Sequence, residues 1–151
     1  LADDLIVSEP GCLKQLLEIH EKTQSSVLGV FSASENQVSN YGVISSKNID
    51  GIEKVDGIVE KPKPADAPSN LAVFGRYILS KDIFLNIEQI NPGLNNEIQL
   101  TDAIQDLISN QDVFALEFEG RRFDCGSKEG YISAIIDRAS SIDKYKSIIE
   151  K

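Results

Sequence analysis

The adjacent pair Glu60-Lys61, followed by Pro62, combines two side chains suited to a polar ligand with negative charge. A carboxylate accepts hydrogen bonds from two hydroxyl groups, and an ammonium group is a compact donor to phosphate oxygens. Neighbouring side chains on an extended segment leave on opposite sides, so both reach one ligand only if the chain twists at the end of a strand. Taken alone, the dipeptide is more typical of a surface ion pair.

Two aspartates, Asp3 and Asp124, form a second candidate site, although they are far apart in the sequence. Both lie at expected strand ends, where open α/β sheets bind their ligands. Two carboxylates about 4 Å apart repel each other by about 4 kcal/mol at an effective dielectric constant of about 20, and a divalent cation removes that cost. For Asp3 alone, a polar position near the chain end is an equally good interpretation.

The composition limits the classes of partner. The chain has 151 residues and a formal net charge of −9 at pH 7, with 41% hydrophobic and 26% charged residues, which is typical of a globular protein. Its charge repels nucleic-acid phosphates and anionic lipids, so we expect neither nucleic acid nor a membrane as a partner. The sequence shows neither a leader pattern nor an apolar run of the roughly 20 residues that span a bilayer. The two cysteines, Cys12 and Cys125, do not have the spacing of a disulfide framework or a zinc site. These features predict a cytoplasmic protein.

Alternating helical and extended patterns must position these residues. Helical spacing predicts helices at about 11–23, 81–87, 97–110, 128–139 and 143–151, and apolar runs predict strands at 27–31, 41–44, 52–59, 71–79, 113–118 and near 123. We expect Tyr131, Ala134 and Ile135 to face inward. We expect an extended loop at 61–69, because a residue before proline favours extended geometry, and a solvated turn at Arg121-Arg122.

Five short segments, in the same order, resemble the sugar-1-phosphate nucleotidylyltransferase family. They are Tyr41-Gly42-Val43, Val59-Glu60-Lys61-Pro62, Ser69-Asn70-Leu71-Ala72-Val73-Phe74-Gly75-Arg76-Tyr77, Glu97-Ile98-Gln99-Leu100-Thr101-Asp102 and Asp124-Cys125-Gly126. Three segments are similar to the branch that uses UTP and glucose 1-phosphate: Ser8-Glu9-Pro10-Gly11, Glu60-Lys61-Pro62-Lys63 and Asn70-Leu71-Ala72. The resemblance covers roughly residues 1–140.

The resemblance implies an α/β fold, a Rossmann-like three-layer sandwich with a mixed sheet, in which residues 1–151 form the carboxyl-terminal part of one domain. It implies an Mg²⁺-dependent nucleotidyltransferase that joins UTP to glucose 1-phosphate, gives UDP-glucose and diphosphate, and is a homo-oligomer when full-length. The family's amino-terminal, nucleotide-binding half has no match here. We therefore expect this chain alone to be inactive, with an exposed sheet edge that favours self-association.

The resemblance also assigns residues to the sugar. It implies that Glu60 accepts hydrogen bonds from glucose hydroxyls and that Lys61, also a catalytic candidate, neutralises the sugar phosphate. Gly42 and Val73 are expected to bring backbone against the sugar, although a glycine is equally typical of close packing. Tyr77 is a weaker candidate for the same site.

The metal site follows from the same resemblance. It implies that Asp3 and Asp124 bind Mg²⁺, which prefers hard oxygen ligands, and that Asp124 is a catalytic candidate. We expect these aspartates to converge with Glu60 and Lys61 on one pocket. Glu97 and Asp102 are more typical of structural positions near a helix start, with a minority chance that Glu97 borders the sugar.

Two alternatives stay open. One is a related nucleotidylyltransferase for another base or sugar, because the base-reading surface is not among these residues. The other is a non-catalytic module that binds sugar phosphates. A Gly-x-Gly-Thr-Arg loop upstream of these residues would indicate the enzyme, and its absence would indicate the module.

Overall fold

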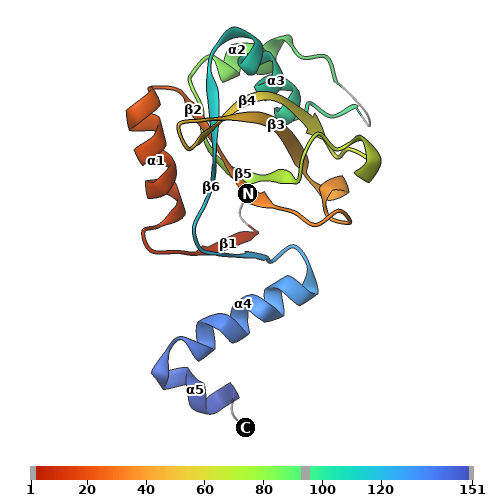
Figure 1. The fold of residues 1–151 in the computed structure, drawn as a ribbon. Helices are drawn as coiled ribbons and strands as arrows, with labels where there is room; N and C mark the ends of the chain where they lie inside the picture. The colour runs from red at the N-terminus through yellow and green to blue at the C-terminus, as the bar shows by residue number, and fades with distance from the viewer. Residues whose placement is uncertain (1–2, 93–95, 150–151) are drawn as a thin grey trace. The chain divides into compact units, whose positions relative to one another are not determined.

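The computed structural model describes residues 3–92 and 96–149. The chain divides into two compact units (Figure 1). The central unit is Leu13–Phe118, and the terminal unit combines Leu1–Cys12 with Glu119–Lys151. That residues 1–151 belong to one domain stays a prediction.

Five strands of the central unit close into a ring. Their order is β2 (Ser26–Ser32), β5 (Leu71–Ile78), β3 (Gly42–Ile49), β4 (Ile52–Glu60) and β6 (Val113–Glu117). β2 and β6 are parallel, whereas the other neighbouring strands are antiparallel, so the predicted α/β class with a mixed sheet is confirmed. Few pairs close the ring: among the described residues, β4 pairs with β6 only at Glu53 and Lys54, and β3 pairs with β5 only between Val43 and Ala72. Stretches of both strands therefore keep an edge without a strand partner, and the expected exposed edge stays a prediction.

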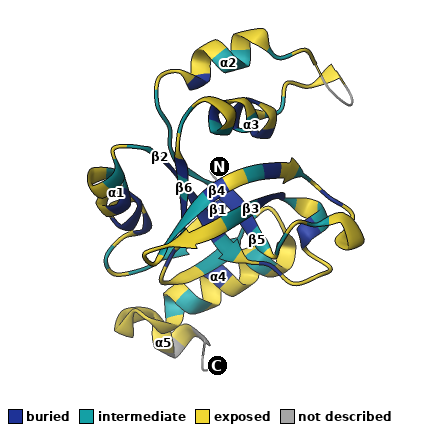
Figure 2. Cartoon of the chain, turned by 45° about the horizontal axis from the view of Figure 1, so that its top comes forward, coloured by how far each residue is buried: buried dark blue, intermediate teal, exposed yellow. Residues whose placement is uncertain are grey.

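The core of the central unit lies between the ring and helix α3 (Leu100–Asn110). Ile104 and Leu107 of α3 are at most 1% exposed, and they belong to one cluster with Ile44 of β3 and Ile58 of β4. The spacing of three residues between Ile104 and Leu107 places them on one face of the helix, as predicted. Figure 2 shows α3 next to the shorter helix α2 (Ile83–Gln89), which packs against it.

Most predicted elements are confirmed within one to three residues. Helix α1 (Cys12–Thr23) buries Leu16, and α3 begins at Leu100, three residues later than expected. Glu97 therefore precedes the helix. A short 3₁₀ turn, Pro64–Asp66, interrupts the loop at 61–69. Among the residues described, no helix has the length and apolar character to span a membrane.

The terminal unit is built on a two-stranded antiparallel sheet of β1 (Asp4–Val7) and β7 (Arg121–Asp124). Helix α4 (Lys128–Ser140) packs against β7 and against α5 (Asp143–Ile149). Its start is capped by Ser127, whose side-chain oxygen accepts a hydrogen bond from the Gly130 N–H at 3.0 Å.

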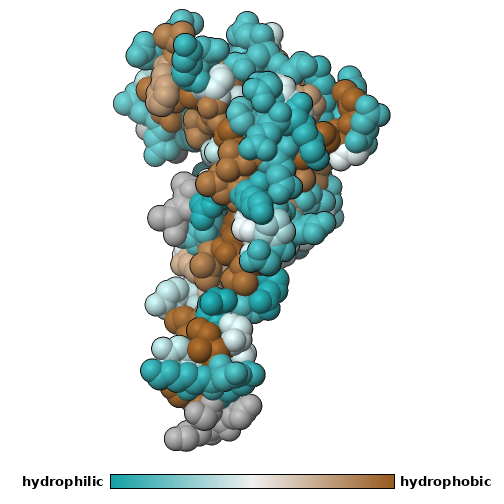
Figure 3. Space-filling view, turned by 90° about the vertical axis from the view of Figure 1, so that its left-hand side faces the viewer, coloured by the Kyte–Doolittle hydropathy of each residue, from teal (hydrophilic) through white to brown (hydrophobic). Residues whose placement is uncertain are grey.

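Two expectations for this unit are wrong. Ala134 is buried, but Tyr131 and Ile135 are 56% and 50% exposed, because β7 and α5 cover only the Ala134 side of α4. Apolar atoms accordingly reach the surface of the terminal unit (Figure 3). The pair Arg121-Arg122 forms part of β7 instead of a solvated turn, because both residues pair with β1.

The hairpin of β3 and β4 is fastened at its distal end by Glu53. Its carboxylate accepts hydrogen bonds from the Ser46 hydroxyl at 2.6 Å and from the Asn48 amide at 2.8 Å. These bonds, that from Asn48 first, hold the pKa of Glu53 below its ordinary value. The opposite end of the same hairpin carries Gly42 and Glu60.

We predict that Glu53→Gln lowers the free energy of unfolding at pH 7 by about 0.5–1 kcal/mol, because the ionised acceptor is lost. A carboxyl whose pKa is lowered by folding stabilises the fold above its unfolded pKa of about 4.3 and loses this contribution as the pH falls through the folded value. Urea unfolding at several pH values should thus show the difference shrinking below about pH 4. The control is Glu35→Gln in an exposed loop; a difference that did not depend on pH would contradict the assignment.

Candidate functional site

The hairpin register places Glu60 directly opposite Gly42. Gly42 is the first residue of β3, Glu60 is the last residue of β4, and the two are Cα partners. The Lys61 N–H extends the pairing by donating to the Tyr41 carbonyl oxygen at 3.0 Å. The site therefore begins where two paired strands end, as the sequence predicts.

A left-handed turn at Lys61 brings its side chain to the same side as Glu60. Lys61 has a φ of 45°, which a residue with a side chain adopts only when the surroundings hold it. Its Nζ lies 3.8 Å from Oε1 of Glu60. The twist that the sequence requires is thus present, and it produces an ammonium and a carboxylate side by side.

The two members of this pair differ in burial. The Lys61 side chain is 60% exposed, whereas that of Glu60 is 25% exposed. An ion pair with one exposed partner contributes little to stability, about 0–1 kcal/mol. Both groups are consequently available to a ligand at small cost to the fold.

Gly42 is closely surrounded. A Cβ atom at this position would lie 2.8 Å from Cγ2 of Thr101, 3.1 Å from Cγ2 of Val73 and 3.3 Å from Oε2 of Glu60. Gly42, Glu60 and Val73, all predicted from the sequence, therefore lie together. Thr101 of α3 completes the cluster. The sequence does not single out Thr101, because the residues of its segment with functional side-chain chemistry are the acidic Glu97 and Asp102.

Tyr77 lies elsewhere on β5. It is four residues beyond Val73, which is about 13 Å along a strand, and it is the Cα partner of Leu28. The structure shows Tyr77 packed against the hydrophobic core of the central unit. Its assignment to the sugar site stays a prediction.

The terminal unit brings Asp3 and Asp124 together. The Cys125 N–H donates to the Asp3 carbonyl oxygen at 2.8 Å, next to the paired residues Asp4 and Asp124. A Cβ atom on Gly126 would lie 3.0 Å from Oδ2 of Asp3 and 3.1 Å from Oδ1 of Asp124. Both carboxylates thus face the space beside Gly126, which has no side chain to fill it.

An arginine of β7, Arg122, pairs with two aspartates of this unit. The Arg122 side chain is 11% exposed; its Nε is 2.5 Å from Oδ1 of Asp4, and its Nη2 is 3.9 Å from Oδ2 of Asp124. Burial raises the pKa of Asp4, and the neighbouring Arg122 partly opposes that shift. Arg121 instead forms an ion pair with Asp137. Both arginines thus have carboxylate partners within the unit.

The donor set beside Gly126 suits a hard cation that keeps several water ligands. Asp3 and Asp124 supply carboxylate oxygens, which Mg²⁺ prefers, and Mg²⁺ is commonly held by one or two carboxylates together with phosphate oxygens. In the part of the chain that the structure describes, no cluster of three or more His, Cys, Asp or Glu side chains is arranged to hold a metal. A metal here would take its other ligands from water and substrate.

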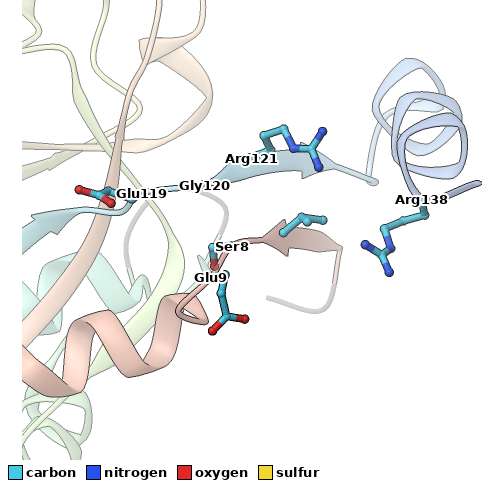
Figure 4. A pocket seen from close by; sticks show the side chains of 7 residues that line it. Ser8, Glu9, Glu119, Gly120, Arg121 and Arg138 are labelled. Carbon is cyan, nitrogen blue, oxygen red and sulfur yellow. The ribbon is translucent and has the colours of Figure 1, made fainter. Parts of the chain in front are cut away.

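A hollow in the terminal unit is a weaker candidate (Figure 4). It lies between the end of β1 and α4 and is lined by Ser8, Glu9, Glu119, Arg121 and Arg138, together with Val7 and Gly120. Two glutamates balance two arginines, so its lining has no net attraction for an anion. None of the predicted site residues lies in it.

Comparisons with known proteins identify the family of the chain. Residues 1–141 match the family model described as nucleotidyl transferase. The chain is 46% identical over 145 residues to a UTP–glucose-1-phosphate uridylyltransferase of Streptococcus pyogenes, covering 92% of this chain and 48% of that protein. The chain therefore spans about half the length of the curated relatives it matches.

Solved structures give the same picture. A UDP-glucose pyrophosphorylase complexed with UDP-glucose superposes with a TM-score of 0.89 at 43% identity, over 94% of this chain and 55% of that one. A UTP-bound UGPase from Acinetobacter baumannii superposes with a TM-score of 0.82 at 33% identity, over 99% of this chain and 53% of that one. The similarity to these solved structures confirms the predicted nucleotidyltransferase fold.

We predict that Gly42→Ala lowers the free energy of unfolding by about 1–3 kcal/mol, because the added methyl group overpacks the space shared with Thr101 and Val73. Gly11→Ala is the matched control, because a Cβ atom there meets nothing within 4 Å, and its effect should stay within about 0.5 kcal/mol. Urea unfolding of both variants measures the difference. Equal effects of the two substitutions would show that Gly42 is not closely packed.

Proposed function

This chain belongs to the nucleotidyl transferase family, and on that premise we propose that it is the glucose 1-phosphate-binding part of a UTP–glucose-1-phosphate uridylyltransferase. The observation that carries the proposal is the cluster of Gly42, Glu60 and Val73 with Lys61 at its rim. The whole protein converts UTP and glucose 1-phosphate into UDP-glucose and diphosphate. Relatives with this activity in their names, matched over 92% of the chain, support this choice over another base or sugar.

The cluster has the polarity that a hexose needs. The carboxylate of Glu60 accepts hydrogen bonds from two sugar hydroxyls, and its partial burial strengthens these bonds. Gly42 and Val73 are proposed to contact the sugar through their backbone, and the close packing of Thr101 and Val73 around Gly42 holds this backbone in place beside the Glu60 carboxylate.

Lys61 neutralises the phosphate. Its ammonium is 60% exposed and next to Glu60, so a phosphate attached to a sugar held by Glu60 meets a cation with three donors. In this reaction the sugar phosphate attacks the α-phosphorus of UTP. Lys61 orients the attacking oxygens and offsets their negative charge, which is electrostatic and positional catalysis without a covalent intermediate.

Asp3 and Asp124 of the terminal unit would hold Mg²⁺. When bound, this ion neutralises negative charge on phosphate oxygens. The aspartates supply two oxygen ligands, and Arg122 limits the repulsion between the carboxylates of the unit.

On this proposal, the residues that recognise the uracil base and bind the triphosphate of UTP lie outside this chain. The chain alone therefore has no activity. The full-length protein is a cytoplasmic enzyme that assembles as a homo-oligomer. A colorimetric assay of diphosphate tests the function: the full-length protein should release it from UTP and glucose 1-phosphate, and the 151-residue chain should not. Release by the chain alone, or a full-length preference for another nucleotide, would contradict the proposal.

We predict that Lys61→Ala in the full-length protein lowers kcat/KM roughly 10²- to 10³-fold, because a charge partner of the phosphate is lost. The matched control is Lys63→Ala, an exposed lysine in the same loop, which should keep nearly full activity. Steady-state kinetics with varied glucose 1-phosphate measures both. If both variants lost activity equally, the role would belong to the loop and not to Lys61.

We also predict that Mg²⁺ raises the melting temperature of the 151-residue chain, because a ligand that binds only the folded state stabilises it. The effect should disappear in Asp3→Asn and Asp124→Asn and should persist in Asp66→Asn, which changes an exposed aspartate of the central unit. Thermal unfolding at increasing MgCl₂ concentration measures the shift. If Asp124→Asn showed the same Mg²⁺-dependent shift of the melting temperature as the wild-type chain, Asp124 would not be a metal ligand.

A further inference from the structure

The last part of β4 has only one strand neighbour. Among the described residues, β4 pairs with β6 at Glu53 and Lys54, whereas its pairing with β3 continues to Glu60. The outward backbone groups between Val55 and Glu60 therefore need partners other than a strand, because unpaired buried N–H groups are costly. The contacts that these backbone groups make therefore determine how rigidly the end of β4 holds Glu60.

A side chain of α3 takes the place of the missing strand. The Ile58 N–H donates to Oε1 of Gln105 at 2.8 Å, across 47 residues of sequence. A Cβ atom built on Gly57, next to Ile58, would lie 3.5 Å from Oε1 of Gln105, which is an ordinary contact distance, so the amide lies directly beside this backbone. The amide of Gln105 thus caps the edge of β4 two residues before Glu60.

The same face of α3 reaches the ligand cluster. Thr101 is one turn before Gln105, and residues four apart lie on the same face of a helix. The methyl group of Thr101 is the nearest neighbour of a Cβ atom built on Gly42. α3, which packs along β4 in Figure 1, therefore contacts the hairpin both at its end and two residues before it.

We propose that Gln105 is a positioning residue for the sugar-phosphate site: through the Ile58 N–H, it fixes the end of β4 so that Glu60 stays opposite Gly42. This inference rests on the proposed function. Ile58 and Glu60 project to the same face of β4, since side chains alternate along a strand, and the Ile58 side chain is fixed in the core. Loss of the bond frees the strand end to shift, and the carboxylate moves away from the sugar hydroxyls.

Three variants of the 151-residue chain test this role. Gln105→Met keeps the length of the side chain and removes the oxygen acceptor, whereas Gln105→Glu keeps an acceptor. Ile108→Ala removes packing of α3 against the core cluster without touching the Ile58 N–H. Calorimetric titration gives the affinity for glucose 1-phosphate, amide hydrogen exchange follows Ile58, and urea unfolding gives the stability.

We expect Gln105→Met to weaken glucose 1-phosphate binding roughly five- to fiftyfold and to speed exchange at Ile58, because a buried donor loses its partner. Gln105→Glu should restore both, and Ile108→Ala should lose stability with unchanged affinity. Unchanged affinity of Gln105→Met, with a stability loss like that of Ile108→Ala, would overturn the positioning role and leave the proposed function intact. Absence of binding by the wild-type chain would overturn both.

Discussion

The antiparallel register of β3 and β4 is the constraint on which the account of the site depends. It sets Gly42, the first residue of β3, opposite Glu60, the last residue of β4. A residue with any side chain at position 42 would fill the space that Val73, Thr101 and the Glu60 carboxylate share. The hydrophobic core holds this register, since a slip of one residue would turn either Ile44 or Ile58 away from it, depending on which strand moved.

The two sites that contain carboxylates are assembled by different interactions. Glu60 is placed by a hairpin and has its cation in the next residue, Lys61, brought to the same side by a left-handed turn. Asp3 and Asp124 are brought together across almost the whole chain by the pairing of β1 with β7, and the nearby cation is Arg122, whose side chain is 11% exposed. A phosphate and a metal ion need opposite charges, and the chain supplies one site of each kind.

Local patterns predicted most of the elements because apolar periodicity and proline positions act within a few residues. The stripe of Ile104 and Leu107 predicts α3, and the pair Glu60-Lys61 together with its neighbouring motifs predicts the candidate site. Closure of the strands into a ring was not predicted, since it depends on a few long-range pairs such as Val43 with Ala72.

The same limit applies to single side chains. Thr101 and Gln105 carry no charge, so only their long-range contacts reveal them. The most direct test of the central claim is a map of amide chemical shifts in the ¹⁵N-labelled chain as glucose 1-phosphate is added. The account predicts that the largest changes occur at Gly42, Glu60, Lys61 and Val73. Changes confined to residues 128–149, with these four amides unmoved, would contradict it.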